Sequence, residues 1–135
     1  MKEILAVIRM NKINQTKASL VQAGYPSMTA VRVMGRGSKP VDYEVVKAAS
    51  TQTDPIPEVL DRLTAPPRLI AKRMISLVVP DEAVPVVVKT IIEANSTGSA
   101  GDGKIFVLPV MDAMRVRTYE TGDAAISEMA GNQGG

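Results

Sequence analysis

The sequence predicts an α+β domain in which a strand–helix–strand unit occurs twice, and three observations lead to this fold class. Short apolar runs typical of strands occur at 3–9, 28–35, 74–80 and 104–110. Stretches with apolar residues at helical spacing follow the first and third of these runs. A long connection, from about 38 to 71, separates the two halves. This order of elements is that of a ferredoxin-like βαββαβ fold.

The first half begins with the run EILAVIR, which is rich enough in Ile, Leu and Val to form a buried strand. Asn11 is expected to cap the following helix, which carries Ile13, Leu20 and Val21 on one face and stops at Gly24. The run MTAVRVMG then provides the second strand.

The second half repeats this pattern from the run MISLVVP onward. Asp81 is expected to cap its helix, and Pro85 falls in the first turns, where its missing amide costs least. The apolar residues at helical spacing are Val84, Val87, Val88, Ile91 and Ile92. Two helices cover only one face of a four-stranded sheet, so we expect another subunit to cover the other face.

Composition excludes several classes of function. The chain of 135 residues fits one domain, with 16 Lys and Arg against 14 Asp and Glu. Without Cys or His, it has no disulfides, no thiolate nucleophile, no Ser-His-Asp triad and no Cys/His zinc site. Aromatic residues make up only 3% of the chain, too few for the stacking platform of a single-strand nucleic-acid binder. With no apolar run long enough for a membrane span and no signal peptide, we expect a cytoplasmic protein.

Three clusters indicate a ligand that carries phosphates. The glycine-rich run Thr97–Lys104 can turn backbone amides toward one anion, although a flexible turn is the alternative. Period-two alternation in a predicted strand would place Arg115 and Arg117 on one face, and an exposed edge strand is the alternative there. The weakest cluster is Gly35–Gly37, for which a plain turn is the better interpretation when it is taken alone.

Taken together, these stretches resemble the PII signal-transduction family over nearly the whole chain. The resemblance is carried by MKEILAVI, GYPSMTAVRVMGRG, SLVVPDE, TGSAGDGKIFVLPV and RVRTYETGDAAI. It implies a trimer whose subunit clefts bind ATP or ADP and, with magnesium-ATP, 2-oxoglutarate. It also implies a domain over 1–118, a target-binding T-loop over about 36–72, and a segment 119–135 that is flexible at its end. The resemblance further implies a regulator that is not an enzyme.

The resemblance also assigns roles to individual residues. The positions that match nucleotide contacts are Thr29, Gly35, Gly37, Val78, Gly101, Asp102, Gly103, Lys104, Arg115 and Arg117, the two arginines reaching over from the neighbouring subunit. Those that match the 2-oxoglutarate site are Lys72, Gly37 and Gly101, and those expected to contact partners are Arg36, Lys39, Tyr43, Arg68 and Arg73.

The chain departs from the family pattern at three places. Lys39 stands near the place of a Gln that helps to hold magnesium and 2-oxoglutarate, so we expect this chain alone to bind 2-oxoglutarate weakly. The usual modified Tyr of the T-loop has no clear match, since Tyr43 lies elsewhere in the loop. Tyr119 replaces a usual Gly, with no effect that the sequence predicts.

The long T-loop and the stretches RMNKINQTK and PPRLIAKRMISLVVPDE resemble a nitrogenase-associated branch of the family. In that branch two different PII-like chains assemble and inhibit nitrogenase by binding its dinitrogenase component. We therefore expect a nitrogenase regulator, with a second PII-like subunit as partner and no nucleic acid or membrane. The alternatives are a general PII regulator of an ammonium transporter or glutamine synthetase, and a small phosphotransferase or ATPase in which Asp102 is the only candidate general base.

Overall fold

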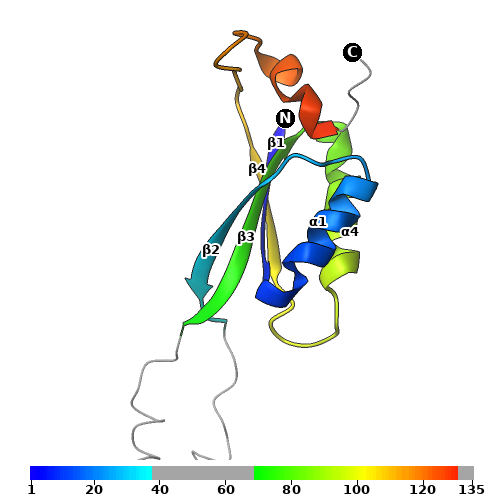
Figure 1. Ribbon diagram of the computed structural model, residues 1–135, viewed down its shortest axis with the longest axis vertical. Coiled ribbons are helices and arrows are strands. Elements are labelled where there is room, and N and C mark those ends of the chain that lie inside the picture. Colours follow the sequence, from blue (N-terminus) through cyan, green and yellow to red (C-terminus); the bar gives the residue numbers. More distant parts are fainter. Residues whose placement is uncertain (38–68, 131–135) are drawn as a thin grey trace, which may run out of the picture. The chain divides into compact units, whose positions relative to one another are not determined.

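The computed structural model describes residues 1–37 and 69–130, which contain a four-stranded sheet with two helices on one face (Figure 1). The strand order β2-β3-β1-β4 is that of a ferredoxin-like fold, and the predicted fold class is confirmed. The main elements are β1 (Lys2–Arg9), α1 (Ile13–Gln22), β2 (Thr29–Gly35), β3 (Ile70–Val79), α4 (Val84–Asn95) and β4 (Lys104–Pro109). The 3-10 segments are η1 (Met10–Lys12), η2 (Asp81–Ala83) and η3 (Gly122–Ala130).

The chain divides into two units. Met1–Val33 and Ala71–Gly135 form the first, and Met34–Ile70 forms the second. No helix within the described residues is long and apolar enough to cross a membrane. In the C-terminal segment, Ala125 and Ile126 of η3 are buried, whereas 131–135 lie outside the described residues.

The core lies between the sheet and the two helices. Alternate residues of β1 and β3 are buried, and they meet Leu20 of α1 together with Val87 and Ile91 of α4. Val21 and Ile92 were expected on the same faces, but they are 54% and 49% exposed. Each follows a fully buried residue by one position, which turns it about 100° around the helix and away from the sheet.

Both predicted helix caps are wrong. Asn11 lies inside η1 and Asp81 begins η2, so each helix is entered through a 3-10 turn. The residues before the two helices are Lys12 and Ala83, and neither makes a side-chain capping bond. The Asp81 carboxylate accepts a hydrogen bond from the amino group of Met1 instead. Pro85 does lie in the first turn of α4, as expected.

A buried polar network fixes the C-terminal end of α4. The Asn95 amide donates from Nδ2 to Thr16 Oγ1 and to the Ile91 carbonyl, both at 2.9 Å. The Thr16 hydroxyl in turn donates to the Lys12 carbonyl at 2.7 Å. Because Thr16 is fully buried and Asn95 is 5% exposed, these bonds form away from water and join α1 to the end of α4.

The strand register places three basic side chains at one end of the sheet. Arg9 lies opposite Lys72 of β3, and Val7 lies opposite Lys104 of β4. Residues paired in this way share a face, and here it is the face without helices, which we call the open face. The open face also carries exposed Phe106 and Leu108, 48% and 37% accessible. We call the end where β1 stops and β3 and β4 start the loop end of the sheet.

Candidate functional site

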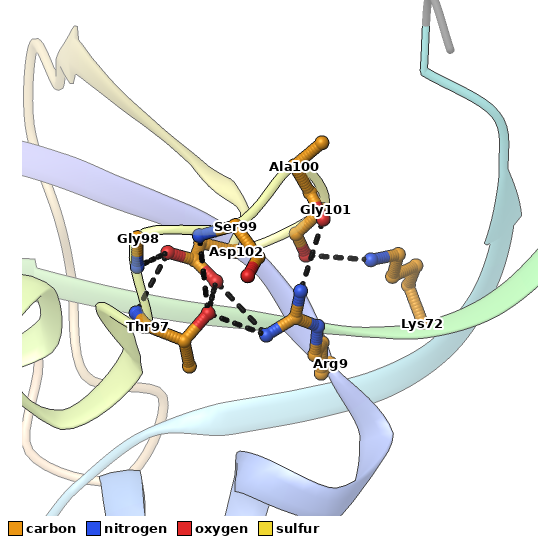
Figure 2. Close-up of polar contacts among 8 residues, drawn as sticks. All are labelled: Arg9, Lys72, Thr97, Gly98, Ser99, Ala100, Gly101 and Asp102. Carbon is orange, nitrogen blue, oxygen red and sulfur yellow. Dashed lines mark hydrogen bonds and ion pairs between the residues drawn. The ribbon is translucent and has the colours of Figure 1, made fainter.

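Residues 97–103, here called the glycine loop, connect α4 to β4 and fold around the carboxylate of Asp102 (Figure 2). Asp102 Oδ2 accepts hydrogen bonds from the backbone amides of Thr97, at 2.8 Å, and Gly98, at 3.1 Å. Its Oδ1 accepts from the Thr97 hydroxyl and from Arg9 Nη1, the latter at 2.9 Å. The carboxylate therefore joins the two ends of the loop.

These contacts set the protonation state of Asp102. The hydrogen bonds from the Thr97 hydroxyl and amide, aided by the Gly98 amide and the Arg9 charge, lower the pKa of Asp102 to about 2 despite partial desolvation. The group is thus ionised at neutral pH, and its oxygens are already engaged. A general base works best with a pKa near the working pH, so Asp102 is poorly suited to that role.

Two basic side chains hold the middle of the glycine loop. Arg9 Nη2 donates to the Ala100 carbonyl at 3.0 Å, while Nη1 also contacts Thr97 Oγ1 at 3.2 Å. Lys72 Nζ donates to the Gly101 carbonyl at 2.9 Å. Figure 2 shows both side chains pointing toward the loop from neighbouring strands. The family resemblance predicts Lys72 as a site residue but does not predict Arg9, whose only local signal is a charge at the end of an apolar strand.

Glycine is required at the end of the loop. Gly103 has a φ of +126°, and a Cβ there would lie 2.3 Å from the Val7 carbonyl oxygen. Gly101 has a φ of +94°, and its Cβ would meet Arg9 Nη2 at 3.5 Å and Lys72 Nζ at 3.7 Å. The loop therefore packs directly against β1 and the two cations.

The expected geometry of Arg115 and Arg117 is wrong, because they do not lie along a strand. Arg115 donates from its amide to the Glu120 carbonyl and accepts at its own carbonyl from the Tyr119 amide, both at 2.9 Å, which closes a tight turn. Its guanidinium contacts the Ala125 carbonyl at 3.2 Å and Ser127 Oγ at 3.1 Å. Arg115 thus ties the turn to η3, while Arg117 is exposed within the turn.

Tyr119 adopts a left-handed backbone conformation, with a φ of +63°. It is the one non-glycine residue with positive φ in the described part of the chain. A Cβ makes this conformation unfavourable, so the backbone here favours the glycine that the resemblance leads one to expect. The side chain is 77% exposed.

The remaining candidates are scattered over the fold. Thr29 is the first residue of β2, and Val78 lies opposite Glu3, toward the start of β1. Arg73 is half-buried opposite Ile8, and its Nε has no hydrogen-bond partner among the described residues. Gly35 ends β2 and is followed by exposed Arg36 and Gly37. Lys39, Tyr43 and Arg68 lie outside the described residues.

Substitution of Gly103 by Ala should destabilise the fold by about 3 kcal/mol or more, because the new methyl group clashes with the Val7 carbonyl and keeps a strained φ. Gly98→Ala is the matched control, since Gly98 also has a positive φ, +79°, but nothing lies within 4 Å of its Cβ position. That control should lose only about 1–2 kcal/mol. Urea unfolding measures both, and equal losses would show that the close approach to β1 is not made.

Replacement of Tyr119 by Gly should stabilise the protein by about 1 kcal/mol, because the relief of left-handed strain exceeds the added chain entropy of glycine. Tyr119→Ala keeps the strain and should bring no gain. Thermal unfolding of the three proteins compares them. If the alanine variant gained as much as the glycine variant, the benefit would come from removing the exposed ring and not from the backbone.

Comparison with known proteins identifies the fold and its family. The profile of the family described as "Nitrogen regulatory protein P-II" matches residues 1–120. "Nitrogen fixation nifHD region GlnB-like protein 2" of Methanobacterium ivanovii is 51% identical, covering 93% of this chain and 99% of that protein. The protein of the same name from Methanococcus maripaludis is 45% identical, covering 93% of this chain and 100% of that protein.

Two further matches are also P-II proteins. "Nitrogen regulatory protein P-II 1" of Escherichia coli is 36% identical over 93% of this chain and 100% of that protein. The crystal structure of Arabidopsis thaliana PII bound to citrate matches with a TM-score of 0.67 and 31% identity, over 93% of this chain and 88% of that one. With a family match over nearly its whole length and relatives of this similarity, the chain belongs to the nitrogen regulatory protein P-II family.

Proposed function

We propose that this chain senses ATP and ADP and inhibits nitrogenase by binding its dinitrogenase component in the cytoplasm, without catalysing a reaction itself. The observation that carries the nucleotide part is the charge at the loop end of the sheet. Arg9, Lys72 and Lys104 all lie on the open face there. The nearby acid, Asp102, already has its oxygens engaged by Arg9 and by the Thr97 amide of the loop. This surplus of positive charge beside a glycine-rich loop suits a polyphosphate.

The two groups of proposed phosphate contacts lie at opposite ends of β4 within one chain. The glycine loop precedes Lys104, whereas Arg115 and Arg117 follow Pro109 (Figure 1). Six residues of strand span roughly 20 Å, too far for both groups to hold one nucleotide. We infer that the arginines serve a cleft made with another subunit, in a trimer that is homomeric or shared with a second PII-like chain. The exposed apolar residues of the open face fit burial in such an assembly.

The nitrogenase part of the proposal rests on the relatives. Several bear names that place them in a nitrogen fixation nifHD region, and each of these matches covers 93% of this chain. In this proposal the T-loop, 36–72, makes the contact with nitrogenase through Arg36 and through Lys39, Tyr43 and Arg68, which lie outside the described residues. Arg73 of β3, just beyond the loop, would add to this contact. Its five prolines limit the conformational freedom that docking would remove.

A variant in which residues 42–66 are replaced by a short Gly/Ser linker tests the nitrogenase contact. It should still assemble and bind ATP, because none of the glycine loop or the sheet is altered. It should no longer inhibit nitrogenase. Acetylene reduction by purified nitrogenase, with the unaltered chain as positive control, measures the difference. Inhibition that persists in the linker variant would place the contact outside the T-loop.

For 2-oxoglutarate we expect weak binding by this chain alone, with the effector acting mainly through clefts that a second PII-like subunit completes. Lys39 would place a positive charge where the family has a Gln beside magnesium, and such repulsion at close range amounts to several kcal/mol. Calorimetric titration in the presence of magnesium-ATP should show weak binding, and Lys39→Gln should strengthen it. Tight, stoichiometric binding by the unaltered chain would contradict this expectation.

A further inference from the structure

We infer that Arg9 is the positioning residue of the glycine loop: it fastens the loop in its binding conformation before any nucleotide arrives. That this conformation binds a nucleotide rests on the proposed function. That Arg9 fastens the loop concerns the ligand-free chain and does not depend on that function. Arg9 would act through the loop and need not touch the nucleotide.

Arg9 is well placed to act as a fixed anchor. It is the last residue of β1, which lies between β3 and β4, and it pairs across the sheet with Lys72. Its side chain is only 28% exposed. A guanidinium held in this way has little freedom left to lose when it binds the loop, so its contacts restrain the loop effectively.

The guanidinium contacts the loop at its start, middle and end. Nη1 reaches Thr97 Oγ1 and Asp102 Oδ1, at 3.2 and 2.9 Å, and Nη2 reaches the Ala100 carbonyl at 3.0 Å (Figure 2). These three residues span nearly the whole loop. A planar fork makes such contacts together, whereas a lysine ammonium at the same position offers a single charged centre. Lys72 makes one loop contact, with Gly101, and so complements Arg9 without replacing it.

Arg9 also removes an electrostatic obstacle. The Asp102 carboxylate sits inside the loop that is proposed to face phosphates, and two anions at short range repel each other. The ion pair with Arg9 offsets the Asp102 charge where the phosphate would bind. Loss of Arg9 would therefore loosen the loop and leave the negative charge of Asp102 without its ion-pair partner.

Amide hydrogen exchange in the ligand-free protein tests the positioning role directly. The amides of Thr97 and Gly98 donate to Asp102, so their exchange reports whether the loop is fastened. We expect Arg9→Gln to speed their exchange about tenfold or more, while the amides of β1 and β3 keep their protection. Lys17→Gln, which removes one exposed positive charge from α1, is the matched control and should change neither.

Calorimetry with ATP then separates geometry from charge. Arg9→Gln should weaken ATP binding at least tenfold. Arg9→Lys keeps the charge but loses the fork, so it should speed amide exchange like Arg9→Gln while losing less ATP affinity. Should Arg9→Gln fail to fold, the exchange and affinity of Arg9→Lys decide the question.

The possible results distinguish this inference from the proposed function. Unchanged exchange at Thr97 and Gly98 in the Arg9 variants would overturn the positioning role, whatever their ATP affinity. Faster exchange in a chain that binds no ATP even with Arg9 intact would support the fastening of the loop by Arg9 and overturn the nucleotide-sensing function. Faster exchange with undiminished ATP affinity would show that the fastened loop is not the binding conformation.

Discussion

The pairing of β1 with a strand on each side fixes the place of every cation around the glycine loop. Arg9 faces Lys72 on one side, and Val7 faces Lys104 on the other. A slip of one residue would carry these charges to the helix-covered face and bring Ile8 to the open face. The apolar core therefore specifies the register, and the register in turn gathers the positive charge. Stability and ligand chemistry depend here on the same hydrogen-bonded ladder.

Beside these cations, the glycine loop is held in a fixed conformation before any ligand binds. Its conformation is held by contacts within the chain: Asp102 binds the amides at the start of the loop, and Gly103 lies against the backbone of β1. A loop that is ordered in advance loses less entropy when it binds a ligand. Asp102 therefore has a structural role, and its lowered pKa is a consequence of the bonds that shape the loop. This structural role agrees with the proposal that the chain is a regulator and does not itself catalyse a reaction.

The fold can be predicted from the sequence because strand alternation and helical spacing are local signals, as in Ile4, Ala6 and Ile8 of β1. Features that depend on partners distant in the sequence cannot be predicted in this way. Arg9 and Asp102 are 93 residues apart in the sequence, and no local sequence pattern predicts their ion pair. The stretch around Arg115 reads as a strand by alternation, but a turn closed by Tyr119 overrides that pattern. The candidate site residues named by resemblance stay predictions for the binding of a nucleotide.

The central claim is that one nucleotide cleft takes its glycine loop from one copy of the chain and its arginines from another. ATP binding by mixed assemblies tests it most directly. Lys104→Ala chains and Arg117→Ala chains should each bind ATP poorly when assembled alone. Assembled together after unfolding and refolding, they should regain binding, because some clefts then combine an intact Lys104 with an intact Arg117 of the neighbouring chain. Mixed assemblies that bind no better than the separate variants would contradict the account.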